Sequence, residues 1–299
     1  MHILITGGTG LIGRNLCKTL LAQGHELTVL SRNPASVPIK CGATVHSMAS
    51  LAEWHPGKKF DAVINLAGAP IVDRRWTARR KRALWGSRID LTDELVRHIA
   101  TAGHKPSVLI SGSAVGYYGN RGDTELDEMA PAGEDFGAHL CKAWEDSARI
   151  AEKVGVRVCL LRTGLVLSQN GGMLGRMLPP FKLGLGARLG NGKQWMSWVH
   201  IDDYTAIVLR LLDDAQASGP YNMTAPQPVS NTEFTAALAK ALRRPAVFVA
   251  PAWLLKLAMG ERASLLLEGQ KVLPGKISAA GYRFQFADLA AALDNLLNK

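Results

Sequence analysis

The amino-acid sequence predicts an α/β fold in which a doubly wound parallel sheet is joined to a smaller, discontinuous α+β domain. The first apolar run, residues 3–5, leads into a glycine-rich turn and then into a segment, 11–23, with apolar residues at helical spacing. Apolar runs of strand length recur at 61–66, 107–110 and 157–161, with helical patterns between them. Strands that alternate with helices are typical of a parallel sheet covered on both faces.

The composition is that of a globular protein, because 47% of the 299 residues are hydrophobic. The chain starts directly on a strand and contains no apolar run of membrane-spanning length, so we expect no signal peptide, no membrane segment and a cytoplasmic location. The cysteines are scattered, with no Cys-x-x-Cys pair and no histidine cluster, which favours reduced thiols over disulfides or a metal site. They are Cys17, Cys41, Cys141 and Cys159.

The formal net charge of +10 raises the question of a nucleic-acid partner. The densest basic stretch, 74–88, contains seven Arg and Lys residues and no acidic one. It lacks the signatures of nucleic-acid-binding modules, so an exposed helix face over 79–82 is the favoured interpretation and nucleic-acid binding is the third alternative. Positive charge also suits a phosphorylated cofactor or an anionic small-molecule substrate.

The glycine turn after the first strand fits the dinucleotide-binding fingerprint, with Gly8, Gly10 and Gly13 at its spacing. Without Cβ atoms the backbone turns sharply and approaches a pyrophosphate, while the free N–H groups of the following helix point at the anion. We therefore expect cofactor contacts from Gly7, Thr9, Gly10, Leu11, Ile12 and Gly13.

The expected strands at 26–30 and 61–66 supply further candidate cofactor residues at their carboxyl ends. Ser31 and Arg32 follow the second strand, at the place where an acidic side chain would bind the ribose 2′-hydroxyl of NAD. An arginine with a hydroxyl suits a 2′-phosphate instead, which favours NADP. The small residues 67–69, which follow the strand at 61–66, let a flat cofactor lie against the backbone. The remaining candidates are Leu66, Ala67, Gly68, Arg88 and Ser111.

Five stretches, 6–13, 65–68, 113–119, 161–164 and 198–203, resemble in order and spacing the extended short-chain dehydrogenase/reductases, the group that contains nucleotide-sugar epimerases and dehydratases. Within that group the chain is most similar to the epimerase family proteins that carry a distinctive C-terminal domain. This likeness rests on two further stretches, 179–186 and 266–274. The resemblance implies a Rossmann fold and a hydroxyl or carbonyl substrate, with nucleotide sugars as one class.

The usual catalytic tyrosine of that group is missing from this chain. In the group a tyrosine and a lysine lie four residues apart on one helix face, and a serine from the preceding strand orients the substrate. Here Ser113 stands at the serine position, Ala138 at the tyrosine position and Lys142 one turn later.

Three interpretations of this departure stay open. Tyr117 or Tyr118, on the loop after Ser113, donates the proton; Lys142 retains only a contact with the cofactor ribose; or the site binds the cofactor without turnover. A serine-hydrolase site is not expected, because the Gly-x-Ser-x-Gly elbow is absent. His200 lies in an apolar run, so we expect a buried structural residue there.

The sequence predicts that residues 1–165 and 199–223 form the nucleotide-binding domain, and that 166–198 and 224–299 form the small domain. Residues 168–198 are rich in glycine and either close over an anionic substrate or form an ordinary long loop. Asn231 is expected to cap a helix. The basic residues of the glycine-rich stretch are Arg176, Lys182, Arg188 and Lys193.

The leading functional prediction is an NADP-binding oxidoreductase or epimerase-like enzyme that acts on a small molecule, as a monomer or homodimer. Its candidate catalytic residues are Ser113, Tyr117, Tyr118 and Lys142. The alternative is a non-catalytic, NADP-binding regulatory protein.

Overall fold

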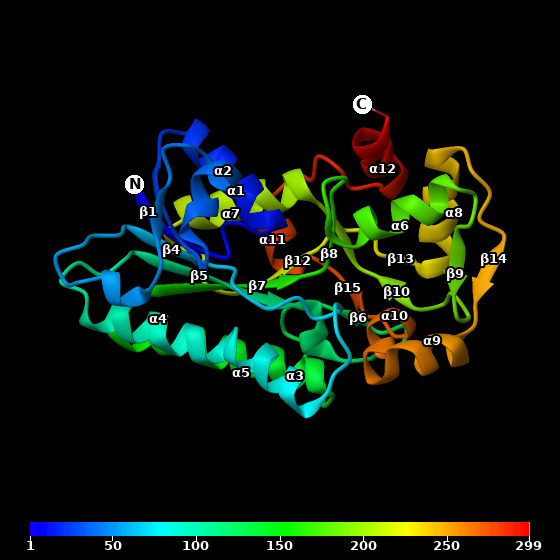
Figure 1. Cartoon of the computed structure of the whole chain (residues 1–299), viewed down its shortest axis with the longest axis horizontal. Helices are drawn as coiled ribbons and strands as arrows, with labels where there is room; N and C mark the ends of the chain where they lie inside the picture. The colour runs from blue at the N-terminus through cyan, green and yellow to red at the C-terminus, as the bar shows by residue number, and fades with distance from the viewer. Residues whose placement is uncertain (299) are drawn as a thin grey trace.

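A seven-stranded sheet forms the centre of the computed structural model, which describes residues 1–298 (Figure 1). All its strand pairs are parallel, in the order β12-β7-β5-β4-β1-β2-β3. The order reverses between β1 and β4, and ligands bind at such switch points in open α/β sheets. The predicted doubly wound sheet is confirmed. Its strands are β1 (His2–Thr6), β2 (Glu26–Leu30), β3 (His46–Met48), β4 (Ala62–Asn65), β5 (Val108–Ala114), β7 (Arg157–Thr163) and β12 (Gly219–Met223).

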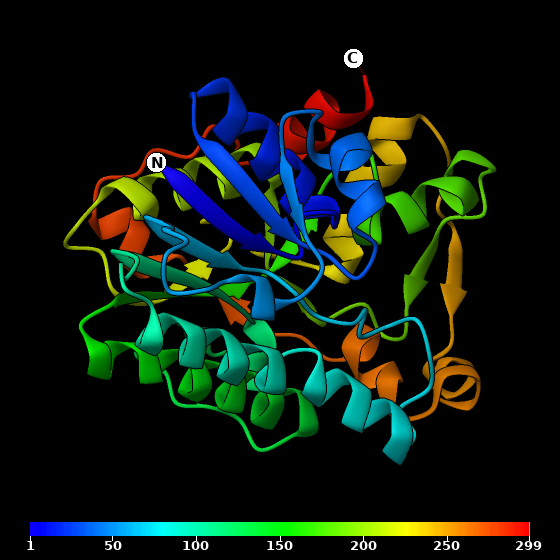
Figure 2. The same cartoon turned by 60° about the vertical axis from the view of Figure 1, so that its left-hand side comes forward.

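Helices cover both faces of this sheet, as Figure 2 shows. Successive side chains of a strand point to opposite faces, so Ile3 and Ile5 belong to one apolar core and Leu4 to the other. The first core includes α1 (Leu11–Ala22), α2 (Val37–Cys41) and α7 (Ile201–Asp213). The second includes α4 (Ile89–Thr101) and α5 (Phe136–Arg149), and α3 (Ala78–Gly86) precedes α4.

The C-terminal part has an apolar core of its own, built around Trp198 and Phe234. This core joins residues 167–198 to residues 225–297, which are distant in sequence. The predicted domain boundaries lie near these limits and stay a prediction. The elements of this part and its connections are β6 (Glu125–Leu126), β8 (Leu165–Leu167), α6 (Gly172–Lys182), β9 (Ala187–Leu189), β10 (Trp195–Met196), β11 (Trp198–His200), β13 (Val229–Ser230), α8 (Asn231–Leu242), β14 (Phe248–Ala250), α9 (Ala252–Met259), α10 (Ser264–Leu267), β15 (Lys271–Val272), α11 (Gly275–Ala279) and α12 (Leu289–Leu297).

The structure decides two local points. Of the two alternatives for residues 168–198, the ordinary long loop is wrong, because α6 buries Leu174, Leu178 and Phe181 against the third core and short strands follow it. The cap of α8 is Ser230 rather than Asn231. Its hydroxyl accepts from the N–H of Glu233, whose carboxylate accepts from the Ser230 N–H, in a capping box.

Within residues 1–298, no helix combines the length and apolarity needed to cross a bilayer. The same part of the chain contains no cluster of potential metal ligands.

Candidate cofactor and active site

The turn between β1 and α1 has a backbone that only glycine fits. Gly7 has a φ of +72°, and a Cβ there would lie 2.7 Å from the carbonyl carbon of Leu66. A Cβ on Gly13 would overlap the carbonyl oxygen of Gly7. Gly10 precedes α1 and provides no side-chain cap for the first turn. The N–H groups at this helix end are therefore placed to receive an anion.

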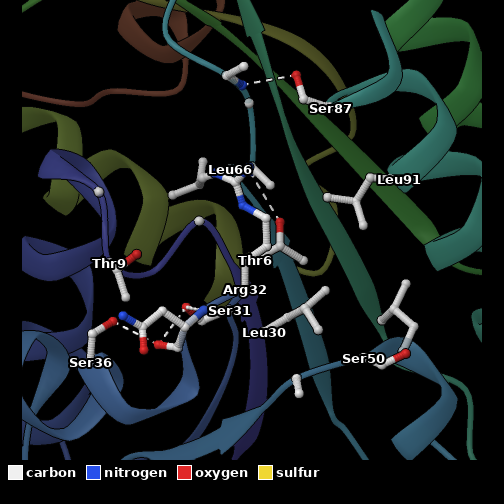
Figure 3. A pocket seen from close by; sticks show the side chains of 18 of the residues that line it. Thr6, Thr9, Leu30, Ser31, Arg32, Ser36, Ser50, Leu66, Ser87 and Leu91 are labelled. Carbon is white, nitrogen blue, oxygen red and sulfur yellow. Dashed lines mark hydrogen bonds between the residues drawn. The ribbon is translucent and has the colours of Figure 1, made fainter. Parts of the chain in front are cut away.

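A cavity of about 640 Å³ lies over this turn and the adjoining strand ends (Figure 3). Eight of the predicted cofactor residues line it, from the ends of β1, β2 and β4. The volume is in the range of known small-molecule and cofactor sites. The eight residues are Gly7, Thr9, Gly10, Ser31, Arg32, Leu66, Ala67 and Gly68.

The β2 side of the cavity is basic and rich in hydroxyl groups. Figure 3 shows the Arg32 side chain reaching into the cavity from the end of β2, with Ser31 and Ser36 on the same side. Among residues 1–298, neither Arg32 nor Lys40 has an ion-pair or hydrogen-bond partner for its charged group. Two unpaired cations beside two hydroxyl groups form a good environment for a phosphate.

The remaining wall of the cavity was missed by the sequence analysis. Leu30, Leu51 and Leu91 give it an apolar surface, and Ser50 and Glu94 add polar groups. Residues 49–51 belong to a segment without periodicity, whose position is set by the pairing of β3 with β2. No local sequence signal points to these residues. An apolar wall of this kind suits the flat face of an adenine ring.

Four predicted cofactor residues lie just outside the cavity lining. Leu11, Ile12 and Gly13 form the first turn of α1, where Gly13 permits close packing on Gly7. Ser111 is fully buried, and its hydroxyl accepts from Nδ2 of Asn65 at 3.2 Å. The first three contribute the backbone N–H groups of the helix end, whereas the buried Ser111 supports the strand beneath the site.

Arg88, the fifth such residue, supports the loop after β4. Its guanidinium donates to the carbonyl of Ala69 at 3.1 Å and packs against Gly68, where a Cβ would lie 2.9 Å from the guanidinium carbon. It also lies over the ring of Trp144, 5.3 Å from the centroid. Burial lowers the pKa of Arg88. A buried guanidinium with these partners holds the loop in place.

Ser113 belongs to a buried ion-pair network. Its hydroxyl donates to Oε1 of Glu145 at 2.7 Å. Arg162 binds the same carboxylate in a bidentate manner, with Nε 2.9 Å from Oε1 and Nη2 3.0 Å from Oε2. All three side chains are at most 4% exposed. Burial alone would lower the pKa of Arg162, but the hydrogen bonds and charge of Glu145 raise it above its ordinary value.

Tyr118 is part of this network. Its hydroxyl donates to Oδ1 of Asn222 at 2.7 Å and accepts from Nη1 of Arg162 at 3.0 Å. The side chain is fully buried, and burial raises the pKa of Tyr118 to about 12. A phenol that already donates its proton inside the core is poorly placed to protonate a substrate, so the geometry does not support the predicted catalytic role of Tyr118.

Tyr117 differs from its neighbour. Its ring stacks on the guanidinium of Arg162, 3.6 Å from the carbon to the centroid, and the side chain is partly exposed. Its hydroxyl has no hydrogen-bond partner within the described chain. Of the two candidate tyrosines, only Tyr117 has a hydroxyl without a hydrogen-bond partner among residues 1–298, and neither tyrosine lines the cavity over the glycine turn.

Lys142 does not reach the cavity, contrary to expectation. Its ammonium pairs with Asp146, one turn further along α5, at 2.7 Å, and both side chains are more than half exposed. The hydrogen bond to Asp146 raises the pKa of Lys142. The preceding residue, Cys141, is the buried one, together with Trp144 and Glu145. Lys142 thus faces solvent, whereas Ala138, at the tyrosine position, is buried.

The comparisons with known proteins cover nearly the whole chain. A model of the NAD dependent epimerase/dehydratase family matches residues 3–224, and a model of a domain of unknown function, DUF1731, matches residues 250–296. An epimerase family protein of Mycobacterium bovis is 41% identical over 295 residues, which are 97% of this chain and 96% of the relative. The chloroplastic SDR39U1 homolog of Arabidopsis thaliana is 39% identical over 300 residues, 98% and 86% of the two chains.

The same relationship is found among solved structures. The crystal structure of human epimerase family protein SDR39U1 with NADPH matches with a TM-score of 0.92 and 36% identity, and the match covers 100% of both chains. The resemblance predicted from the sequence motifs is thereby confirmed. The match includes the C-terminal part as well as the sheet.

Proposed function

This chain belongs to the NAD dependent epimerase/dehydratase family, and on that premise we propose that it is an NADP(H)-dependent oxidoreductase or epimerase-like enzyme. Its reaction changes a carbon-bound hydroxyl or carbonyl group of a small molecule. The fold alone does not determine this chemistry, so the proposal rests on the residues of the site.

The cavity over the glycine turn fits a dinucleotide. A Cβ at Gly7 or Gly13 would clash with neighbouring backbone, so these glycines permit the tight turn, and the uncapped first turn of α1 offers N–H donors to a pyrophosphate. Arg32 and Lys40 are positioned to hold the adenosine 2′-phosphate. When bound, the cofactor supplies or accepts a hydride. The protein orients the cofactor and supplies the proton.

Tyr117 is the proposed proton donor and Ser113 the proposed positioning residue. Because the Ser113 hydroxyl donates its hydrogen bond to Glu145 at 2.7 Å, the Ser113 oxygen is left as an acceptor for a substrate hydroxyl. Arg162 supports the face of the Tyr117 ring and pairs with Glu145, so one buried cation fixes both groups. General acid–base catalysis by such a residue contributes about 10²–10⁴-fold to a rate.

The observation that carries the cofactor choice is the Arg32 guanidinium, which lies in the cavity without a protein partner among residues 1–298. We expect Arg32→Ala to weaken NADPH binding by about 10–100-fold, the equivalent of about 1.5–3 kcal/mol for a charged hydrogen bond. NADH affinity should change little. Calorimetric titration of both cofactors measures the ratio, with Arg97→Ala on the exposed side of α4 as control. An unchanged NADPH/NADH ratio would contradict the role of Arg32.

A non-catalytic NADP-binding protein is the alternative, favoured by one feature. The helix position where the group carries its tyrosine is occupied by Ala138, and the hydroxyl of Tyr118 donates to Asn222 inside the core. Tight NADPH binding without turnover on any hydroxyl or carbonyl compound would support this alternative. A cytoplasmic location stays a prediction, and one relative is a chloroplastic protein of Arabidopsis thaliana.

A further inference from the structure

Exposed apolar side chains gather in one part of the C-terminal region. Of the fourteen large apolar side chains that are exposed among residues 1–298, eight lie in three short stretches, 183–185, 247–249 and 253–257, which we call the β14 patch. Trp253 is 67% exposed and Leu257 is 70% exposed. Both belong to α9, a helix that buries none of its residues. An apolar surface of this kind marks an interaction site.

The fold brings the three stretches of the β14 patch together along one strand. Leu183 and Leu185 precede β9, which pairs in parallel with β14. They lie at the start of β14, because a Cβ on Gly184 would be 3.7 Å from Cγ of Pro245. α9 begins directly after the other end of β14. The patch thus has an apolar loop at one end of the strand and an apolar helix at the other.

β14 is also the free edge of its two-stranded sheet. Within residues 1–298 its one strand partner is β9, and Figures 1 and 2 both show β14 on the outer side of β9. The carbonyl of Ala250 accepts from the N–H of Gly190, on the β9 side, so the backbone groups of Val249 point to the free edge. Charged residues or proline usually protect such edges from pairing. β14 has neither, whereas the edge strand β3 of the large sheet exposes His46 and Ser47.

We propose that a second copy of this chain covers the β14 patch, through antiparallel pairing of β14 with its counterpart about a two-fold axis at Val249. A strand edge offers both donors and acceptors, so it is complementary to itself in the antiparallel orientation. The same axis places the loop end of one patch against the helix end of the other. Leu183 and Leu185 of one protomer then meet α9 of its partner.

The exposed area is large enough for a stable dimer. The exposed fractions of the eight side chains add up to about five whole side chains. At roughly 100–200 Å² for each, one copy would bury about 500–1,000 Å², and stable interfaces bury roughly 800 Å² per partner. A lipid surface fits the patch less well, because the free backbone groups of β14 would lose water there without gaining partners.

The charge near the patch gives the dimer a characteristic salt dependence. Residues 172–193 and 234–260 contain no acidic side chain. Two copies bring like charges closer together, so we expect the Kd of the dimer to fall as salt screens them. An acidic protein or an anionic lipid surface would show the opposite dependence. The exposed basic residues next to the patch in the sequence are Lys182, Arg243, Arg244 and Lys256.

Sedimentation equilibrium of the full chain measures the association. We expect a reversible dimer at about 10–100 μM chain, with a Kd that falls at least about twofold between roughly 0.05 and 0.5 M salt. Val249→Lys sets two ammonium groups against each other across the axis, and Trp253→Lys charges the helix end of the patch. Each should raise the Kd at least about 50-fold. Met129→Lys adds the same charge at a side chain that is 88% exposed outside the patch, and should leave the Kd unchanged.

Circular dichroism melting shows whether each variant is folded, and Trp253→Lys is the decisive variant if Val249→Lys misfolds. A monomer at about 100 μM chain, a Kd that rises with salt, or a Kd that neither patch variant changes would overturn the proposal. An equal rise of the Kd in Met129→Lys would overturn it as well. Monomeric protein that sediments with vesicles of phosphatidylcholine and phosphatidylglycerol would identify a lipid surface as the occupant in place of a second copy.

Discussion

The two polar regions at the carboxyl edge of the sheet are built in opposite ways. At the glycine turn, Arg32 and Lys40 have no protein partners in the part of the chain described, and the first turn of α1 is uncapped. At the end of β5, the polar groups of Ser113, Tyr118 and Arg162 are all paired with protein atoms. Polar groups without protein partners can bind a ligand, whereas polar groups that are paired with each other fix the local conformation.

This difference assigns separate tasks to the two regions. The glycine turn recognises an anion through groups that gain partners only on binding. The Ser113 network is a rigid support for the Tyr117 ring. Among the hydroxyls of Ser113, Tyr117 and Tyr118, only that of Tyr117 has no hydrogen-bond partner in the described residues. We therefore expect substitutions within the network to change mainly stability, and substitutions at the open groups to change mainly binding or turnover.

Breaking the buried ion pair should have the largest effect on stability. Glu145→Ala leaves the Arg162 guanidinium buried and without its carboxylate, which we expect to lower the free energy of unfolding by about 3–5 kcal/mol. Urea denaturation followed by circular dichroism measures this loss. A decrease in the free energy of unfolding of less than about 1 kcal/mol would mean that the network does not give the rigid support described above.

The tyrosine pair separates the two tasks directly. Tyr117→Phe should reduce kcat about 100-fold or more while changing stability by less than about 0.5 kcal/mol. Tyr118→Phe strands Oδ1 of Asn222, so it should cost about 1–3 kcal/mol of stability and preserve turnover once folded. Absorbance of NADPH with a carbonyl panel and parallel urea curves provide both readouts. The opposite pattern would transfer the catalytic role to Tyr118.

The residues that line the cavity at the glycine turn could be predicted from the sequence, because the motif that identifies them lies within one short segment. Gly7, Gly10, Gly13 and Arg32 lie within one strand–turn–helix–strand unit, where glycine spacing has a direct backbone cause. The wall formed by Leu51 and its neighbours could not be predicted, because short elements without periodicity place it.

The position of Lys142 could not be predicted for a different reason. Spacing from Ser113 placed Ala138 and Lys142 at the tyrosine and lysine positions, but spacing alone does not show whether the ammonium group turns toward a ligand or toward solvent. In the structure Lys142 is exposed and Cys141 is buried. One signal was present in the sequence: Glu145 follows Trp144 on the face that also carries Leu140 and Ala148. A carboxylate on an apolar face predicts a buried cationic partner, here Arg162.

Alkaline pH should weaken the network in a defined range. Burial raises the pKa of Tyr118 to about 12, whereas an unfolded tyrosine titrates near pH 10. Above pH 10 the unfolded chain therefore holds fewer protons than the folded chain, and stability falls as pH rises. In Tyr118→Phe this decline between pH 10 and 12 should be shallower by up to about 1.4 kcal/mol per pH unit. Buried Tyr204 leaves a residual slope. Parallel slopes for both proteins would argue against a buried, protonated Tyr118.

Lys142→Ala should have the smallest effect. The Lys142–Asp146 pair is exposed on the surface of α5, and such pairs contribute about 0.3–0.5 kcal/mol. We expect the free energy of unfolding to change by no more than about 0.5 kcal/mol, and NADPH affinity and kcat to change by no more than about twofold. Urea denaturation, NADPH titration and the carbonyl panel measure these quantities side by side. A tenfold loss of NADPH affinity would show that Lys142 turns inward to contact the cofactor ribose, and the outward-facing register of α5 would then not describe the bound state.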